Sequence, residues 1–290
     1  APKMATRGRA AIAAAAAAIG LSAYSHLSSG PPDRLARWQD KWDNKTTAWH
    51  LAEQHPLLLK YHTQLLERQP HESRSPKKSS VLFPLCGSSV DLAHLALRGH
   101  PVYGVEGIKV AVDELLGAFG QEGVPLPGAQ DHRRQAAAAG LKLRTAVAPG
   151  EAGLDTPVEL KAVEGDFLKL STGAAGALGL PAFDAAFDRG GLVAVEPSDR
   201  SAYAAALTGL MAPTGRVLLV AVEHSAFADG RLGPPYTLSE VQVRELFGAD
   251  FSIELLQRED RFELEPVWRK RGCTHFAEVA YLLTRKPRAT

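Results

Sequence analysis

The sequence predicts an α/β fold, with a mostly parallel sheet of about seven strands and helices on both of its faces. Short apolar runs of strand length alternate with segments in which apolar residues recur at helical spacing. Glycine-containing turns follow two of these runs, at residues 86–89 and 188–191. The 290-residue chain has 45% hydrophobic and 22% charged residues, a globular composition that excludes a fibrous or wholly disordered protein.

Two helices are predicted before the sheet begins. Asp33 can cap the first helix, which carries Trp38 and Trp42 at helical spacing. Pro56 suits the first turn of the second helix, because its fixed φ matches a helix start. The polar residues 69–80 that follow predict an exposed loop before the first strand.

Seven apolar runs have the length and composition of strands. The last two have no long helix between them, so we expect an antiparallel pair at the end of an otherwise parallel sheet. A capping-box pattern, Thr237 with Glu240, predicts a helix just before that pair. The seven runs are residues 81–85, 101–106, 158–163, 183–187, 215–222, 251–256 and 276–283.

Residues 120–157 interrupt the alternation of strands and helices. They are rich in Gly, Ala and Pro and contain the basic cluster 132–134. We interpret them as an insertion, helical in part or mobile. Apart from this insertion, residues 31–290 are predicted to form one domain, since Gly30-Pro31-Pro32 breaks the chain from what precedes it.

Residues 1–30 differ in composition from the rest, because they contain no acidic residue and an alanine run at 10–19 preceded by three basic residues. An organelle-targeting peptide, a secretory signal, a short membrane helix and a tail without a chemical role all fit this pattern. As a helix, residues 10–27 would span about 27 Å, slightly less than a bilayer core of about 30 Å. We favour an Ala-rich helix that contacts a mitochondrial or plastid membrane or a protein complex, with a cytoplasmic location as the alternative.

Charge and cysteine content exclude two classes of site. Lys and Arg number 33 and Asp and Glu 32, so the chain lacks the basic excess of a nucleic-acid specialist, and we expect no nucleic-acid partner. Cys86 and Cys273 are too few for a disulfide framework or a multi-cysteine metal site, and we interpret both as structural. We predict no metal, and we interpret His50 and His55 as surface or capping residues.

A glycine turn and an acidic residue form a nucleoside-binding pattern at the ends of the first two strands. Ligands of open parallel sheets bind at the carboxyl ends of the strands. Glu106 ends the second strand nineteen positions after Gly87. The glycine allows close approach of the backbone, and the carboxylate accepts hydrogen bonds from ribose hydroxyls. The turn lacks G-x-G-x-x-G, which disfavours a dinucleotide, and an ordinary strand–turn–helix unit remains the alternative.

Six motifs resemble those of the thiopurine S-methyltransferase family, in order from about residue 33 to residue 285. The first is that family's N-terminal tryptophan signature, and the second is its first nucleotide loop. The third contains its ribose-binding acid, and the fourth follows its fourth strand. In this sequence the motifs are Trp38–His50, Phe83–Gly87, Gly104–Glu106, Asp188–Ala194, Gly233–Tyr236 and Tyr281–Thr284.

The resemblance implies a seven-stranded, Rossmann-like class I methyltransferase fold and the cofactor S-adenosyl-L-methionine. It also assigns site residues by position. Trp38, Leu85 and Gly87 would line the cofactor site, and Glu106 would bind the ribose. Gly165 and Asp166 would lie by the adenine. Arg189 would act catalytically between cofactor and acceptor, and Trp49 would form a wall of the acceptor pocket.

The resemblance therefore implies methyl transfer to a small thiol, selenol or similar soft nucleophile. A sulfonium methyl is already activated, so the protein mainly aligns the nucleophile and excludes water. Arg189 could favour a thiolate by its charge. The sequence departs from the family in two places. Residues 265–267 stand where an arginine is expected, although Arg269 or Arg271 could replace it, and the 120–157 insertion is longer than is usual in the family. The alternative is a catalytically weak or inactive accessory subunit of an organellar membrane complex, anchored by its N-terminal helix.

Overall fold

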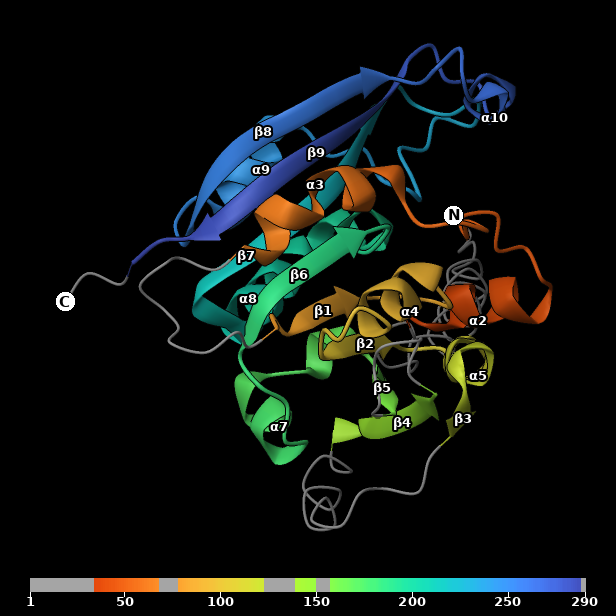
Figure 1. Cartoon of the computed structure of the whole chain (residues 1–290). Helices are drawn as coiled ribbons and strands as arrows, with labels where there is room; N and C mark the ends of the chain where they lie inside the picture. The colour runs from red at the N-terminus through yellow and green to blue at the C-terminus, as the bar shows by residue number, and fades with distance from the viewer. Residues whose placement is uncertain (1–33, 68–77, 123–138, 150–156, 288–290) are drawn as a thin grey trace, which may run out of the picture.

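The computed structural model describes residues 34–67, 78–122, 139–149 and 157–287. Nine strands in these ranges form one twisted sheet, with helices on both faces (Figure 1). The strands are β1 (Val81–Pro84), β2 (Val102–Glu106), β3 (Gln121–Glu122), β4 (Lys142–Ala148), β5 (Val158–Glu164), β6 (Phe183–Arg189), β7 (Met211–His224), β8 (Phe251–Asp260) and β9 (Phe276–Arg285).

The sheet has the strand order β3-β4-β5-β2-β1-β6-β7-β9-β8. Its five central strands, from β5 to β7, run parallel to their neighbours. At one end β9 runs antiparallel to both β7 and β8, which confirms the antiparallel pair expected from the sequence. The carboxyl ends of the five central strands and the start of β9 therefore share one edge of the sheet, called the C-terminal edge below.

All seven predicted strands are present, and two further strands lie inside the region interpreted as an insertion. The described parts of residues 120–157 include β3 and β4, which extend the sheet beyond β5. Arg144 on β4 explains why this segment is extended, since its buried guanidinium lies 2.7 Å from Glu122, 2.7 Å from Asp113 and 2.8 Å from Glu164. These ion pairs tie β4 to β3, to the helix after β2 and to β5. The expectation of seven strands is thus corrected to nine.

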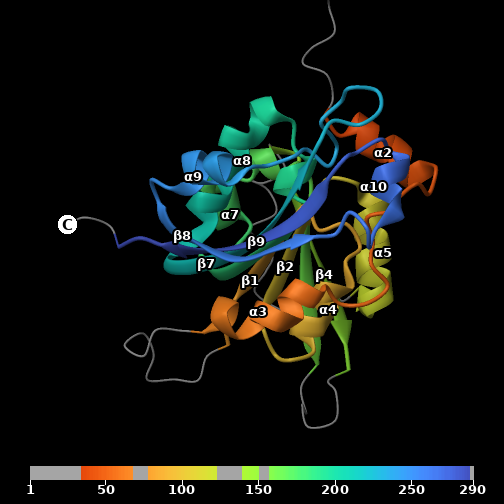
Figure 2. The same ribbon diagram turned by 90° about the horizontal axis from the view of Figure 1, so that it is seen from above.

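Helices cover both faces of the sheet (Figure 2). Those that follow β1 and β2 pack on one face with α3, while those from the second half of the chain pack on the other. Two further helices, α2 and α10, lie on the side to which the arrowheads of β6 and β8 point in Figure 1. The helices are α2 (Ala36–Asp43), α3 (Pro56–Leu66), α4 (Val90–Ala96), α5 (Lys109–Phe119), α7 (Thr172–Ala177), α8 (Arg200–Leu210), α9 (Glu240–Phe247) and α10 (Pro266–Lys270).

The starts of three helices test the capping predictions. Helix α3 begins at Pro56 as expected. Helix α2 has Leu35 at its N-cap without a side-chain hydrogen bond, and Asp33 lies outside the described residues. Helix α9 is capped by Ser239 with Gln242, not by the predicted pair of Thr237 and Glu240. The reason is that the Thr237 hydroxyl accepts a hydrogen bond from the backbone N–H of His224 instead.

The predicted N-terminal helix in residues 1–30 lies outside the described residues, so its contact with a membrane or a complex stays a prediction. In the part of the chain that the structure describes, no helix combines the length and the apolar character needed to cross a lipid bilayer.

A buried corner fixes the chain directly after β6. The Tyr203 hydroxyl donates a 2.9 Å hydrogen bond to Asp188 Oδ2, and the Leu192 N–H donates to Asp188 Oδ1 at 3.1 Å. Both Asp188 and Tyr203 have no exposed surface. Burial raises the pKa of Asp188 to about 6, although these hydrogen bonds oppose the rise. The corner therefore orients the backbone that carries the next residue, Arg189.

The substitution Tyr203→Phe should lower the free energy of unfolding by about 1–3 kcal/mol at pH 7, because the buried Oδ2 atom of Asp188 loses the hydroxyl that donates to it. The pKa of Asp188 is higher in the folded than in the unfolded chain, and losing the hydroxyl raises it further. The deficit should therefore shrink as the pH falls from 7 to 5, where folded Asp188 becomes protonated. Urea unfolding at both pH values measures it.

Tyr281→Phe is the matched control for this measurement. Tyr281 is also fully buried, but its hydroxyl has no hydrogen-bond partner among the described residues. Its removal should change the free energy of unfolding by less than about 0.5 kcal/mol. Equal deficits for the two variants would contradict the assigned role of the Tyr203 hydroxyl.

Candidate active site

The loop after β1 and the end of β2 form the centre of the candidate site. Gly87 has φ +54° and lies in the left-handed region, as does Leu85 at +47°, an unusual conformation for a side chain that branches. The Gly87 N–H donates to Glu106 Oε2 at 3.0 Å, and the Ile108 N–H donates to Oε1 at 2.8 Å. Burial raises the pKa of Glu106, against these backbone hydrogen bonds. The carboxylate is thus held rigidly by backbone donors and keeps lone pairs for further donors.

The end of β5 adds the next part of the site. The Gly165 N–H donates a 2.8 Å hydrogen bond to the backbone oxygen of Glu106, which fixes the two strand ends side by side. Asp166 accepts a 3.0 Å hydrogen bond from the Leu168 N–H, and its other oxygen lies 3.5 Å from Arg34 Nε. The predicted cofactor residues from β1, β2 and β5 therefore meet at the C-terminal edge.

Arg189 ends β6 and marks the other side of the site. Its Nη1 donates a 2.6 Å hydrogen bond to the backbone oxygen of Trp49. Among the described residues, no carboxylate oxygen lies within 4.0 Å of its guanidinium. Burial lowers the pKa of Arg189, while the charges of Glu278, Asp91 and Glu265 oppose that shift. The guanidinium is thus partly desolvated and without an ion-pair partner in the described chain.

Helix α2 and the segment after it cover the space between these two parts. The rings of Trp38 and Trp49 meet edge to face at 5.5 Å, and Trp42 lies 6.4 Å from Trp49. Trp42 is only 7% exposed and packs against Ile108, so it anchors α2 in the core. Arg37 holds the helix in place through a 2.7 Å ion pair to Glu196, beyond β6.

Of the two histidines interpreted as surface or capping residues, His50 lies inside the site and His55 is a buried cap. The ring of His50 lies 4.8 Å from Trp42, and its buried Nε2 has no hydrogen-bond partner among the described residues. His55 does cap α3, but it is only 3% exposed and its Nε2 lies 3.4 Å from Glu278. His50 could have been suspected because it follows Trp49 directly, whereas nothing in the sequence connects His55 with Glu278.

The two cysteines and the altered arginine region also have defined surroundings. Burial, followed by the charge of Glu106, raises the pKa of the Cys86 thiol well above its usual value, so that thiol stays neutral. Cys273 is buried. Glu265, where the family arginine was expected, accepts hydrogen bonds from Arg261 Nε at 2.6 Å and from Trp268 Nε1 at 2.8 Å.

The two arginines suggested as replacements, Arg269 and Arg271, have partners other than Glu265. Arg269 pairs with Glu263 at 2.5 Å, and Arg271 donates to the backbone oxygen of Pro234 at 2.9 Å. The arginine that contacts this region is Arg261, which the sequence analysis did not single out.

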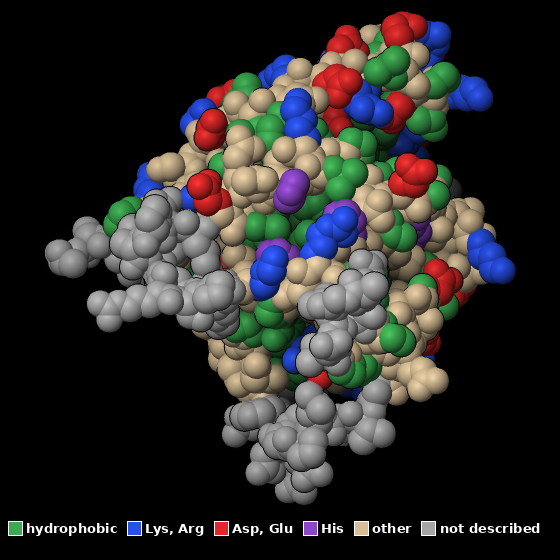
Figure 3. Space-filling model, viewed as in Figure 1, with side chains coloured by type: hydrophobic (Ala, Val, Ile, Leu, Met, Phe, Trp, Pro, Cys, Tyr) green, Lys and Arg blue, Asp and Glu red, His purple; other side chains and the backbone are tan. Residues whose placement is uncertain are grey.

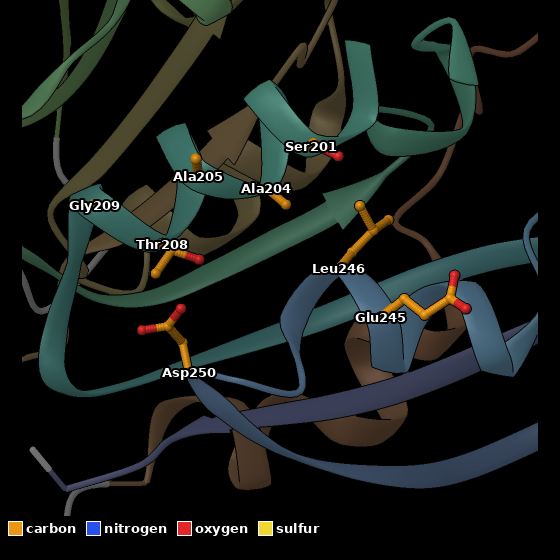
Figure 4. A pocket seen from close by; sticks show the side chains of 8 residues that line it. All are labelled: Ser201, Ala204, Ala205, Thr208, Gly209, Glu245, Leu246 and Asp250. Atoms are coloured by element: carbon orange, nitrogen blue, oxygen red, sulfur yellow. The ribbon is translucent and has the colours of Figure 1, made fainter. Parts of the chain in front are cut away.

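One hollow in the described surface lies away from the candidate site. It lies between α8 and α9 and is lined mainly by small side chains, with Glu245 and Asp250 as its charged members (Figure 4). Thr208, Gly209 and Asp250 lie where α8 ends and β8 begins, at the sheet edge opposite the candidate site. On the face seen in Figure 3, the described basic and acidic side chains are interspersed, without a continuous basic patch.

The comparison with protein families decides the assignment. The family model described as thiopurine S-methyltransferase matches residues 34–144 and 156–286, which include every residue assigned to the site above. The chain belongs to the thiopurine S-methyltransferase family. It is an S-adenosyl-L-methionine-dependent methyltransferase of that family. The resemblance of the six sequence motifs is thereby confirmed.

Individual relatives agree with this family. A probable thiopurine S-methyltransferase from Danio rerio is 32% identical over 257 residues, covering 87% of this chain and 95% of that protein. A thiopurine S-methyltransferase from Methylococcus capsulatus is 30% identical over 246 residues, covering 85% and 95%. The solved structure of a methyltransferase from Anabaena variabilis has a TM-score of 0.50 at 12% identity, over 86% of this chain and 93% of that one, and shows the fold alone.

The residues present fit the cofactor of the thiopurine S-methyltransferase family. Glu106 is fixed by two backbone donors and can still accept hydrogen bonds from a ribose diol. Gly87 leaves no room for a side chain, since a Cβ there would lie 2.7 Å from His50 Nε2. The buried His50 Nε2 has no hydrogen-bond partner among the described residues, so a polar group of a bound ligand could supply one.

The substitution Gly87→Ala should weaken S-adenosyl-L-methionine binding more than tenfold, because the new Cβ requires a strained φ and collides with His50. Isothermal titration calorimetry measures the change. Gly99→Ala is the control, since Gly99 has φ +83° but no atom within 4 Å of the added Cβ. Gly99→Ala should leave the affinity within about twofold, and equal affinities of the two variants would contradict the assigned role of Gly87 in cofactor binding.

Proposed function

We propose that this methyltransferase transfers the methyl group to the sulfur of a small thiol, or to a selenol or similar soft nucleophile. The observation that carries the proposal is the guanidinium of Arg189, which is partly desolvated, fixed by the backbone oxygen of Trp49 and free of an ion pair in the described chain. A cation in this state favours the anionic form of a nearby nucleophile. Thiols and selenols ionise at a much lower pH than alcohols, so a nearby cation can favour their anions at neutral pH.

The other residues keep the roles that the family resemblance implies, and their positions support this assignment. When bound, S-adenosyl-L-methionine supplies an already activated methyl group. Glu106 accepts hydrogen bonds from the ribose, and Gly165 and Asp166 lie beside the adenine. Leu85 and Trp38 contribute apolar surface along the cofactor.

The acceptor side of the site depends on apolar cover and on charge. Trp49 walls the acceptor pocket, and the tryptophans of α2 exclude water from the reacting atoms. Arg189 stabilises the thiolate and does not itself exchange a proton, because a guanidinium stays charged even with its lowered pKa. The accessory-subunit alternative gains no support from the comparisons or from the described residues, and an organellar location stays a prediction.

A matched series of acceptors tests the proposal. The protein is incubated with S-adenosyl-L-methionine and thiophenol, phenol or aniline, which share one ring and differ in the nucleophilic atom. We expect S-methylation of thiophenol, detected by mass spectrometry, and no methylation of phenol or aniline. Cofactor binding without methylation of thiophenol or of a selenol would contradict the proposal, as would a preference for oxygen or nitrogen.

A further inference from the structure

Glu278 on β9 and Arg189 on β6 lie on the same face of the sheet. Phe187, Val220 and Ala280 belong to one core cluster on the α3 and α4 side, and side chains alternate along each strand. Arg189 follows Phe187 by two positions and Glu278 precedes Ala280 by two, so both point to this face. The register pairs Arg189 with Val220 and Val220 with Ala280. Glu278 therefore lies two residues nearer the C-terminal edge than the level of Arg189.

Glu278 is a shielded carboxylate with few partners. Its side chain is 15% exposed, and its only hydrogen-bond partner among the described residues is His55, 3.4 Å from Oε1. Burial raises the pKa of Glu278, but the hydrogen bond and charge of His55 and the charges of Arg261 and Arg189 together bring the pKa below its ordinary value. Glu259 is paired with Glu278 across the strands and is itself 3.6 Å from Arg261. The carboxylate is therefore ionised at neutral pH.

His55 is fixed in the tautomer that orients this carboxylate. Its Nδ1 accepts a hydrogen bond from the Leu57 N–H at the start of α3, so in the neutral ring the proton lies on Nε2, which faces Glu278. The backbone N–H of His55 donates to Asp91 Oδ1 at 2.8 Å, which anchors α3 to α4. His55 is thus a positioning residue held by two helices, and it leaves the second oxygen of Glu278 unengaged.

The guanidinium of Arg189 and the carboxylate of Glu278 lie on one face of the sheet, near its C-terminal edge, and form no ion pair with each other. Their charges interact, yet no nitrogen–oxygen distance between them is within 4.0 Å. Each is held by a different partner, Arg189 by the backbone oxygen of Trp49 and Glu278 by His55. A cation and a carboxylate that are held separately on the same face offer complementary groups to one ligand. A thiol matches both, since its S–H can donate to the carboxylate and its sulfur can lie against the cation.

We propose that Glu278 is the base that accepts the proton of the acceptor thiol, a role that rests on the function proposed above. The S–H bond breaks and its proton passes to the free oxygen of Glu278. The sulfur electron pair forms the new S–CH3 bond, and the electrons of the broken sulfonium–methyl bond return to the donor sulfur, giving S-adenosyl-L-homocysteine. Glu278 then releases the proton to water, so that no further reactant is needed.

The neighbouring carboxylates are already engaged. Glu265 accepts hydrogen bonds from Arg261 and Trp268. Asp91 accepts from the backbone of His55. Glu278 alone among the three acidic residues whose charges raise the pKa of Arg189 keeps an oxygen without a hydrogen bond in the described chain. This difference singles it out as the proton acceptor.

Glu278→Gln tests the role through the acidity of the acceptor. With an alkyl thiol, which is mostly protonated at pH 7, kcat/KM should fall about 10²- to 10⁴-fold. With a nitro-substituted thiophenol, which is already ionised at pH 7, the fall should be less than about tenfold. The variant's rate with the alkyl thiol should also rise about tenfold per pH unit up to the thiol pKa, whereas the unaltered protein should show a much flatter profile.

Two further variants keep the test decisive. Glu278→Asp retains a carboxylate and should keep the flatter pH profile at a reduced rate. For Glu265→Gln, any loss of kcat/KM should be the same with the alkyl thiol and with the nitro-substituted thiophenol. An equal loss for both thiols in Glu278→Gln, or an unchanged pH profile, would overturn the role of Glu278. Failure of the unaltered protein to methylate either thiol would instead overturn the proposed function.

Discussion

Glu106→Gln should bind S-adenosyl-L-methionine at least about a hundredfold more weakly than the unaltered chain, equivalent to about 3 kcal/mol. The amide has the shape of the carboxylate but lacks its charge, and it turns one acceptor into a donor. Both carboxylate oxygens accept backbone hydrogen bonds, so the amide group must face either the Gly87 N–H or the Ile108 N–H, and one donor is left without a partner. Isothermal titration calorimetry measures the affinity.

Glu114→Gln provides the matched control for Glu106→Gln. Glu114 lies on α5, close in sequence, but it is exposed. Its substitution should leave the affinity within about twofold. Burial raises the pKa of Glu106, so removing its charge should not lower the free energy of unfolding as much as it lowers the affinity. Tight binding by a folded Glu106→Gln protein would contradict the assigned role in ribose binding.

Arg189→Met should lower kcat/KM for thiol methylation about 10²- to 10³-fold, the usual cost of removing one preorganised charge from a developing anion. Affinity for S-adenosyl-L-methionine should change much less, because the backbone and carboxylate contacts from β1, β2 and β5 remain. Since burial lowers the pKa of Arg189, the neutral side chain should also fold without a large loss of stability. Steady-state kinetics and calorimetry measure the two effects separately.

Arg189→Lys separates charge from shape in this prediction. An ammonium keeps the positive charge but lacks the planar fork that reaches the Trp49 oxygen. We expect activity between those of the unaltered protein and Arg189→Met. An Arg189→Met variant with full activity toward thiols would remove the observation on which the proposed function rests.

The strand pattern was predictable because each strand carries its own local signal. Apolar runs at 215–222 and 276–283 become β7 and β9, which lie in the centre and at the antiparallel end of the sheet. The two strands that the sequence analysis missed, β3 and β4, lack such runs. Their extended form depends on Arg144, whose three carboxylate partners lie on other elements and are not recognisable before folding.

The candidate site was predictable only where neighbouring residues form a motif. Gly87 and Glu106 stand at a characteristic spacing, and the structure joins them by a hydrogen bond. His55 and Glu278 are 223 positions apart and meet only because β9 runs antiparallel to β7 beside α3. A capping histidine and an acid in a strand are individually ordinary, so their pairing has no sequence signal.

The reversed direction of β9 divides the site between separate stretches of the chain. Groups assigned to the cofactor come from α2 and from the strand ends that precede residue 190, whereas Glu278 lies on a strand that begins at the C-terminal edge. The β8–β9 hairpin can therefore change in length or side chains without disturbing the Gly87–Glu106 contact. We therefore expect that exchanging this hairpin between relatives alters the choice of acceptor while preserving the methyl donor, so that residues 251–285 form a natural unit for engineering.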